Sequence, residues 1–62
     1  MILELKSVAS VIDTETKIVY PKYQMGGYDK LSGIHLDNLP QSFVNEMKEE
    51  DITLINENTK TN

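Results

Sequence analysis

The chain has 62 residues, no cysteine and a net charge of −4, which comes from ten acidic residues and six lysines with no arginine. This length allows one small domain, and the absence of cysteine excludes disulfides and favours a reducing compartment, so we expect a cytoplasmic protein. The dispersed lysines and the lack of a long apolar run argue against direct nucleic-acid binding and against a membrane span.

Residues 2–21 carry the pattern of a β-hairpin. Apolar and β-branched residues alternate loosely over 2–12, which predicts one strand or a strand broken into two. The polar segment 13–17 (DTETK) begins with an aspartate and is typical of a turn. β-Branched residues resume after it, and we expect Ile18 to pair with Ile12 across the hairpin. An N-terminal hairpin is therefore the first predicted element.

Residues 24–33 (QMGGYDKLSG) are predicted to form a loop, because the glycines allow positive φ angles. The loop contains glycine, lysine and serine, but its spacing differs from that of phosphate-binding loops and no βαβ unit surrounds it. We therefore expect it to connect two elements rather than to bind phosphate. The segment 34–36 that follows favours a short strand or an extended stretch.

Residues 37–51 are predicted to form one amphipathic helix. Either Asp37 or Asn38 can cap its first turn, in which Pro40 is tolerated. Its apolar residues recur every four positions, at Leu39, Phe43 and Met47. The acidic residues at 49–51 oppose the helix dipole at the C-terminal end, so fraying is expected there.

The last part of the chain divides into an apolar run at 52–55, which could add a strand, and a polar segment at 56–62, which we predict to be a flexible tail. Together these elements predict an α+β fold with a single domain over residues 1–55. The domain contains an N-terminal β-hairpin, either alone or extended to a three-stranded sheet by 34–36 or 52–55, and one short α-helix packed on one face.

The sequence offers little for catalysis or metal binding. His35 is the single histidine, and Asp37 would point the same way from an extended segment, but two ligands are too few for zinc. The serines lack the Gly-x-Ser-x-Gly setting of a hydrolase nucleophile. We therefore expect no catalytic residue, metal or cofactor, with His35 at a sheet edge and Asp37 at a helix cap.

All three tyrosines lie within residues 20–28. Tyrosine is enriched at protein interfaces because it brings a large contact area and a polar tip at low entropic cost. In a strand Tyr20 and Tyr23 have opposite parity, so at least one is expected to stay accessible; the alternative is that the tyrosines half-cover a small core. The predicted protein interface consists of Tyr20, Tyr23, Tyr28, Ile34 and His35.

The stretch from Val11 to Asp51 resembles short proteins of tailed bacteriophages. Those proteins carry a Val-x-Asp-Thr-x-Thr-x-x-(Ile/Val)-Tyr-Pro segment, a glycine-containing loop, a Gly-(Ile/Val)-x-(Ile/Leu)-Asp segment and a short acidic helix. The matching positions here are Asp13, Thr14, Thr16, Tyr20, Pro21, Gly33, Ile34, Leu36 and Asp37. The resemblance implies a small accessory protein that is made during infection and acts by binding in the host cytoplasm.

We therefore expect a small non-enzymatic factor that binds a host protein, or a second copy of itself in a homo-oligomer. One alternative is a virion or assembly component whose sheet edge adds to a neighbouring subunit. The other alternative is an acidic inhibitor that mimics nucleic acid, which requires the acids to gather on one face.

Overall fold

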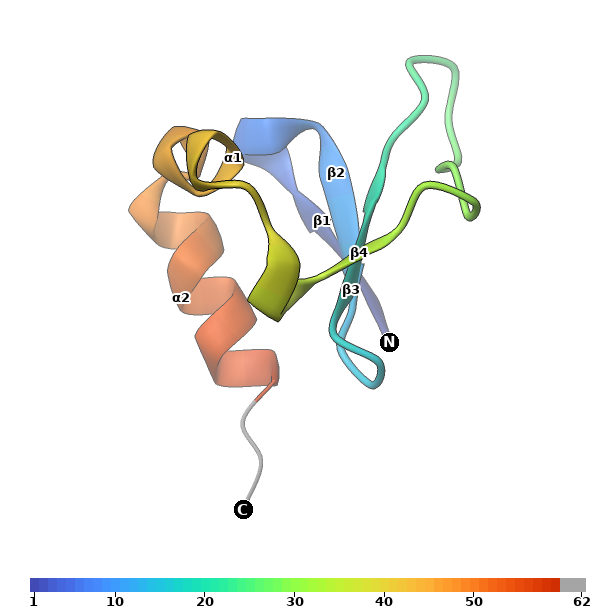
Figure 1. The fold of residues 1–62 in the computed structure, drawn as a ribbon. Coiled ribbons are helices and arrows are strands. Elements are labelled where there is room, and N and C mark those ends of the chain that lie inside the picture. Colours follow the sequence, from blue (N-terminus) through green and yellow to red (C-terminus); the bar gives the residue numbers. More distant parts are fainter. Residues whose placement is uncertain (60–62) are drawn as a thin grey trace.

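The structure is a computed structural model that describes residues 1–59. Within these residues one antiparallel sheet has the strand order β1-β2-β3-β4. Its strands are β1 (Ile2–Leu5), β2 (Ser10–Asp13), β3 (Ile18–Pro21) and β4 (Ile34–His35). Helices α1 (Gln41–Glu46) and α2 (Glu49–Asn58) lie on one side of the sheet, so the predicted α+β class is confirmed, with two α-helices in place of one (Figure 1).

The predicted first strand is broken into two. A short 3-10 helix (Lys6–Val8) and Ala9, whose φ of 48° is positive, turn the chain back on itself. β2 therefore pairs antiparallel with β1, and Leu3 lies opposite Ile12. The loosely alternating residues at 2–12 therefore belong to two neighbouring strands and not to one continuous strand.

The predicted turn between β2 and β3 is present. The Asp13 side chain accepts a hydrogen bond from the backbone amide of Glu15 at 2.9 Å, as expected of a turn that begins with aspartate. The Lys17 amide donates to the Asp13 carbonyl oxygen at 2.7 Å, and Lys17 itself has a positive φ of 64°. The hairpin is thus closed by local polar contacts.

The register of this hairpin differs from the predicted one by one position. Ile12 pairs with Val19, whereas Ile18 lies opposite Asp13. The turn is one residue shorter than expected, because Ile18 already pairs with Asp13. Lys17 makes this possible by adopting a positive φ, which is uncommon for a residue other than glycine. The shift places Ile12 and Val19 on the face that packs against the helices and Ile18 on the other face.

The extended segment predicted after the loop joins the sheet as its fourth strand. Ile34 pairs antiparallel with Val19, and His35 pairs with Ile18. The strand ends there, because Leu36–Asn38 forms a 3-10 helix that leads away from the sheet.

The single helix predicted over 37–51 is wrong. α1 begins after Pro40 without a side-chain cap, so neither Asp37 nor Asn38 caps it. The chain becomes extended at residues 47–48, where ψ is 131° and 158°, and α2 then begins.

The course of α2 corrects the expectations for the C-terminal part. The acids at 49–51 lie in its first turn, where they are favoured by the helix dipole instead of opposing it. Residues 52–55 are helical and form no strand, and residues 56–58, which we assigned to a flexible tail, form the last turn. Positions 60–62 of that tail lie outside the described residues.

The core lies between the sheet and the helices. Leu5 and Ile12 are fully buried and join Val19 and Ile55 in one cluster. The predicted apolar stripe of Leu39, Phe43 and Met47 packs against this cluster. The three residues do not share one helix: Leu39 lies before α1, Phe43 lies in α1, and Met47 lies between α1 and α2. The stripe is therefore confirmed as core, while the continuous helix is not.

A buried carboxylate fixes the break between the helices. Asp51 is only 4% exposed and accepts hydrogen bonds from the backbone amide of Ser7, at 2.8 Å, and from the Ser7 hydroxyl. The same hydroxyl oxygen accepts a bond from the Lys48 amide at 3.1 Å. The bond from the Ser7 hydroxyl holds the pKa of Asp51 below its ordinary value. The start of α2 is thereby tied to the segment between β1 and β2.

Candidate functional site

The side of the sheet away from the helices, which we call the outer face, is covered by long side chains and by no described helix. Val11 is only 7% exposed although this face carries none of the described helices (Figure 1). Glu4 pairs with Lys22 across β2, and this bond holds the pKa of Glu4 below its ordinary value. Tyr20 packs against Tyr28 with ring centroids 5.3 Å apart. On this face long side chains shield the apolar residues from solvent, whereas on the other face the helices shield them.

Gly33 allows the chain to return closely past the outer face. A Cβ atom at this position would lie 2.5 Å from Ile18 Cγ2 and 2.5 Å from Tyr20 Cε1. These distances are shorter than van der Waals contact, so the absence of a Cβ atom lets the Ile18 and Tyr20 side chains pack directly on the backbone of Gly33. The loop and the tyrosine pair therefore form one packed unit with the sheet.

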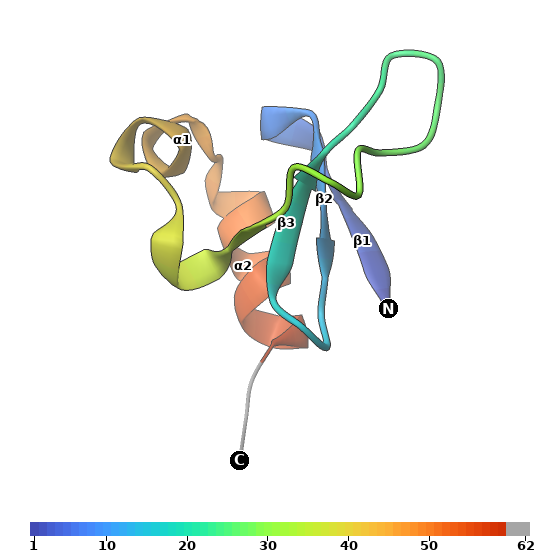
Figure 2. The same cartoon turned by 45° about the vertical axis from the view of Figure 1, so that its right-hand side comes forward.

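Between Tyr20 and Gly33 the chain forms a projecting hairpin over residues 22–28, which we call the finger. Lys22 and Tyr28 form an antiparallel bridge at its base, and the Tyr23 amide donates to the Gly27 carbonyl oxygen at 3.0 Å. Gly27 has a positive φ of 77°, which this tight return needs. Both views show this segment extending away from α1 and α2 (Figures 1 and 2).

The finger exposes large apolar side chains. Met25, near its tip, is 98% exposed, and Tyr23 is 54% exposed. The hydrogen bonds above hold the backbone that carries both side chains. The finger is therefore an ordered segment that presents apolar surface outward.

A second turn follows the finger. The Asp29 carboxylate accepts bonds from the Ser32 hydroxyl at 2.7 Å and from the Leu31 amide at 3.0 Å, and these bonds hold its pKa below the ordinary value, the hydroxyl having the larger effect. Leu31 is 97% exposed. The Lys30 ammonium lies 5.8 Å from the centroid of the Tyr28 ring.

The structure distributes the five residues of the predicted interface over three places. Tyr20 and Tyr28 pair on the outer face, and Tyr23 stands on the finger. His35 lies at the β4 edge of the outer face, where its Nδ1 accepts a bond from the Asp37 amide at 3.1 Å. Ile34 points to the other face of the sheet. Sequence reasoning missed Met25 and Leu31, whose signal was an apolar residue inside a glycine-containing polar loop.

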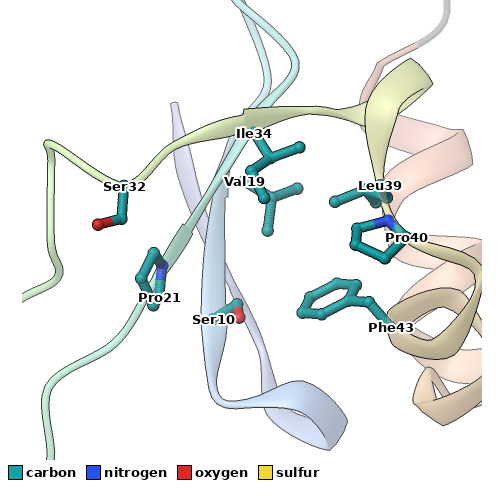
Figure 3. A pocket seen from close by; sticks show the side chains of 8 residues that line it. All are labelled: Ser10, Val19, Pro21, Ser32, Ile34, Leu39, Pro40 and Phe43. Carbon is teal, nitrogen blue, oxygen red and sulfur yellow. The ribbon is translucent and has the colours of Figure 1, made fainter.

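A small apolar pocket opens beside Ile34 on the helix side of the sheet (Figure 3). Its volume is about 160 Å³. Strands β2 to β4, the turn after the finger and the start of α1 all contribute to its lining, which consists of Ser10, Val19, Pro21, Ser32, Ile34, Leu39, Pro40 and Phe43. The lining contains no ionisable side chain, so the pocket suits an uncharged apolar group.

Within residues 1–59 no three histidine, cysteine or acidic side chains come together as metal ligands would. None of the helices in the described part of the chain is long and apolar enough to cross a membrane. The chain was also compared with known proteins: no protein-family model, curated protein or solved structure matches it.

Proposed function

We propose that this protein is a small non-enzymatic binding factor that engages another protein through the finger and the adjoining outer face. The observation that carries this proposal is the almost complete exposure of Met25 on a hydrogen-bonded hairpin, with Tyr23 beside it. Apolar side chains held out on an ordered segment are typical of interaction sites.

The finger suits a binding role because little has to be ordered when a partner arrives. Its base is already bridged and its turn is already closed by hydrogen bonds. Burying Met25 in a partner would contribute roughly 2 kcal/mol, and an interface tyrosine such as Tyr23 commonly contributes about the same amount. Two such anchors with a preorganised backbone support a specific contact.

The polar groups of the domain support binding over catalysis. The hydroxyls of Ser7, Ser10 and Ser32 each donate a hydrogen bond within the chain, to Asp51, Val8 and Asp29 respectively. None of these three hydroxyls is bonded to the imidazole of His35, although histidine is the side chain that most often acts as the base for a serine nucleophile. Each bond instead closes a turn or ties two elements together. The hydroxyls therefore serve the fold.

The resemblance over residues 11–51 supports placing this contact in a bacterial host during phage infection. In that setting the protein acts in the host cytoplasm, and its partner is a host protein. The chemistry of the finger asks for a partner with an apolar groove or cleft that admits one methionine and one tyrosine side chain.

Affinity capture from extract of the host tests the proposal. The double variant Tyr23→Ser/Met25→Ser removes both anchors, and Ile52→Ser, which removes an exposed apolar side chain from α2, serves as the matched control. We expect a partner that binds the wild type and Ile52→Ser and is lost, at least tenfold, with the double variant. Equal capture by all three proteins would contradict the proposal. If the tagged protein captured no host protein and only untagged copies of itself, the result would favour an assembly component.

The charge of the helices favours one second candidate, an inhibitor that imitates nucleic acid. Every charged residue of α1 and α2 is acidic: Glu46, Glu49, Glu50, Asp51 and Glu57. All but Asp51 are exposed. For this candidate, Glu49→Gln/Glu50→Gln should abolish capture of a nucleic-acid-binding protein, while Tyr23→Ser/Met25→Ser should leave the capture unchanged.

A further inference from the structure

The apolar pocket has the size and chemistry to receive one side chain. A cavity of roughly 150 Å³ admits a group the size of benzene, and this pocket measures about 160 Å³. The two hydroxyls in its lining are already engaged, Ser10 with the Val8 carbonyl oxygen and Ser32 with Asp29. The pocket therefore has no unsatisfied polar group to offer, and an aliphatic side chain is its natural occupant.

The chain itself carries such a side chain next to the pocket. Leu31 precedes the lining residue Ser32, and its 97% exposure shows that it does not fill the pocket of its own chain. Its backbone is held by the bond from its amide to Asp29. An apolar knob on an ordered turn thus stands beside an apolar hole of matching size.

The charges around Leu31 are self-complementary. Asp29 and Lys30 precede it with opposite signs, and both lie on the same turn. A two-fold axis near Ser32 would bring Lys30 of each copy towards Asp29 of the other as each Leu31 reaches across. A two-fold contact uses the same patch on both subunits. A patch in which Leu31, the pocket and a pair of opposite charges lie side by side can satisfy this requirement.

From these observations we infer that two copies of the chain associate about a two-fold axis, with Leu31 of each copy seated in the pocket of the other. The contact covers Ile34, which is exposed, and Phe43, which is half-buried. Neither Tyr23 nor Met25 of the finger lines the pocket. A small domain with a four-residue buried cluster gains stability from such a contact.

Sedimentation equilibrium over a range of concentrations tests the inference. We expect the wild type to be in a monomer–dimer equilibrium and Leu31→Ser, which removes both inserted leucines of the dimer, to weaken it about 1,000-fold. Met25→Ser, the matched change at an equally exposed side chain, should leave the equilibrium unchanged. A wild type that stays monomeric at millimolar concentration would overturn the inference, as would equal weakening by both variants.

Cross-linking locates the contact, because the chain has no cysteine of its own. The Ser32→Cys protein, which keeps Leu31 and carries its cysteine on the proposed contact, is treated with a short bis-maleimide; Ile52→Cys on α2 is the control. We expect covalent dimers from Ser32→Cys and none above background from Ile52→Cys. A wild-type dimer whose Ser32→Cys variant does not cross-link would place the contact elsewhere and overturn the inference.

Discussion

The two faces of the sheet are closed in different ways. On the helix side Ile12 and Val19 pack against Ile55 of α2, so secondary structure covers the apolar residues. On the outer face Val11 is nearly as well buried, but its cross-strand neighbours there are Glu4, which pairs with Lys22, and Tyr20, which packs against Tyr28.

This difference separates the face that contains the buried core from the face that we propose to bind a partner. The helix side holds the buried cluster and the hydrogen bonds from Ser7 to the Asp51 carboxylate, which we call the carboxylate latch, and most of the folding free energy is expected to reside there. The outer face is covered by long side chains, and the finger extends from its edge. Met25 on the finger is almost fully exposed and does not belong to the buried cluster. Five predictions test this comparison, beginning with the largest expected effect on stability.

Asp51→Asn should have the largest effect on the free energy of unfolding. The change weakens the bonds from the Ser7 amide and hydroxyl to a buried charged acceptor, which is expected to cost about 3 kcal/mol. Urea denaturation measures the loss, with Glu50→Gln, an exposed neighbour, as the control. Equal stabilities of the two variants would show that the latch does not hold the helices.

The same carboxylate predicts a pH dependence. The pKa of Asp51 in the folded protein is lower than its ordinary value of 3.8, so its contribution to stability is present above that pH. It is lost as the pH falls through the lowered value. The stability of the wild type should therefore decline more steeply in acid than that of Asp51→Asn.

Val19→Ala and Val11→Ala compare the two faces with the same chemical change on adjacent strands. We expect Val19→Ala to cost about 2.5 kcal/mol, because the packed helices cannot move into the space. Val11→Ala should cost nearer 1 kcal/mol, because Tyr20 and Lys22 can settle over it. Denaturant titration of both variants measures the difference, and a reversed order would contradict the comparison.

Gly33→Ala tests whether the loop is part of the outer face. The added methyl group overlaps Ile18 and Tyr20, and overpacking of this kind costs about 2 kcal/mol. Thermal unfolding measures the loss, and Ser32→Ala controls for a change in the neighbouring residue. A Gly33→Ala protein as stable as the wild type would mean that the chain does not pass this closely over β3.

Met25→Ser should change the free energy of unfolding by no more than about 0.5 kcal/mol, since the side chain is almost fully exposed. Tyr23→Ala is expected to behave in the same way. Chemical denaturation compares both with the wild type. A loss as large as that of Gly33→Ala would make the finger a structural element and remove the basis for the binding role that we propose for it.

The hairpin and the loop could be predicted from the sequence because their signals are local. The aspartate at the start of the 13–17 turn binds the turn's own backbone, and paired glycines mark the tip of the finger. The register could not be predicted, because it depends on a positive φ at Lys17, which no local pattern announces.

The division of the helix could not be predicted either. It depends on Asp51 binding Ser7, a contact between residues 44 positions apart. Once α2 is recognised, the acids at its start and the run at 52–55 fit a helix, but the local pattern alone favours other structures. For the candidate site, the opposite parity of Tyr20 and Tyr23 indicated that one of them would be accessible, and Tyr23 is the more exposed. The exposure of Met25 depends on how the finger projects from the sheet.

Site-specific photo-cross-linking in host cells tests the central claim, that the finger contacts a partner, most directly. A benzophenone amino acid replaces Met25 in one protein and Glu15, exposed at the β2–β3 turn, in the control. The account predicts a discrete heavier adduct with a second protein from position 25 and none from position 15. No adduct from position 25, or the same adduct from both positions, would contradict it.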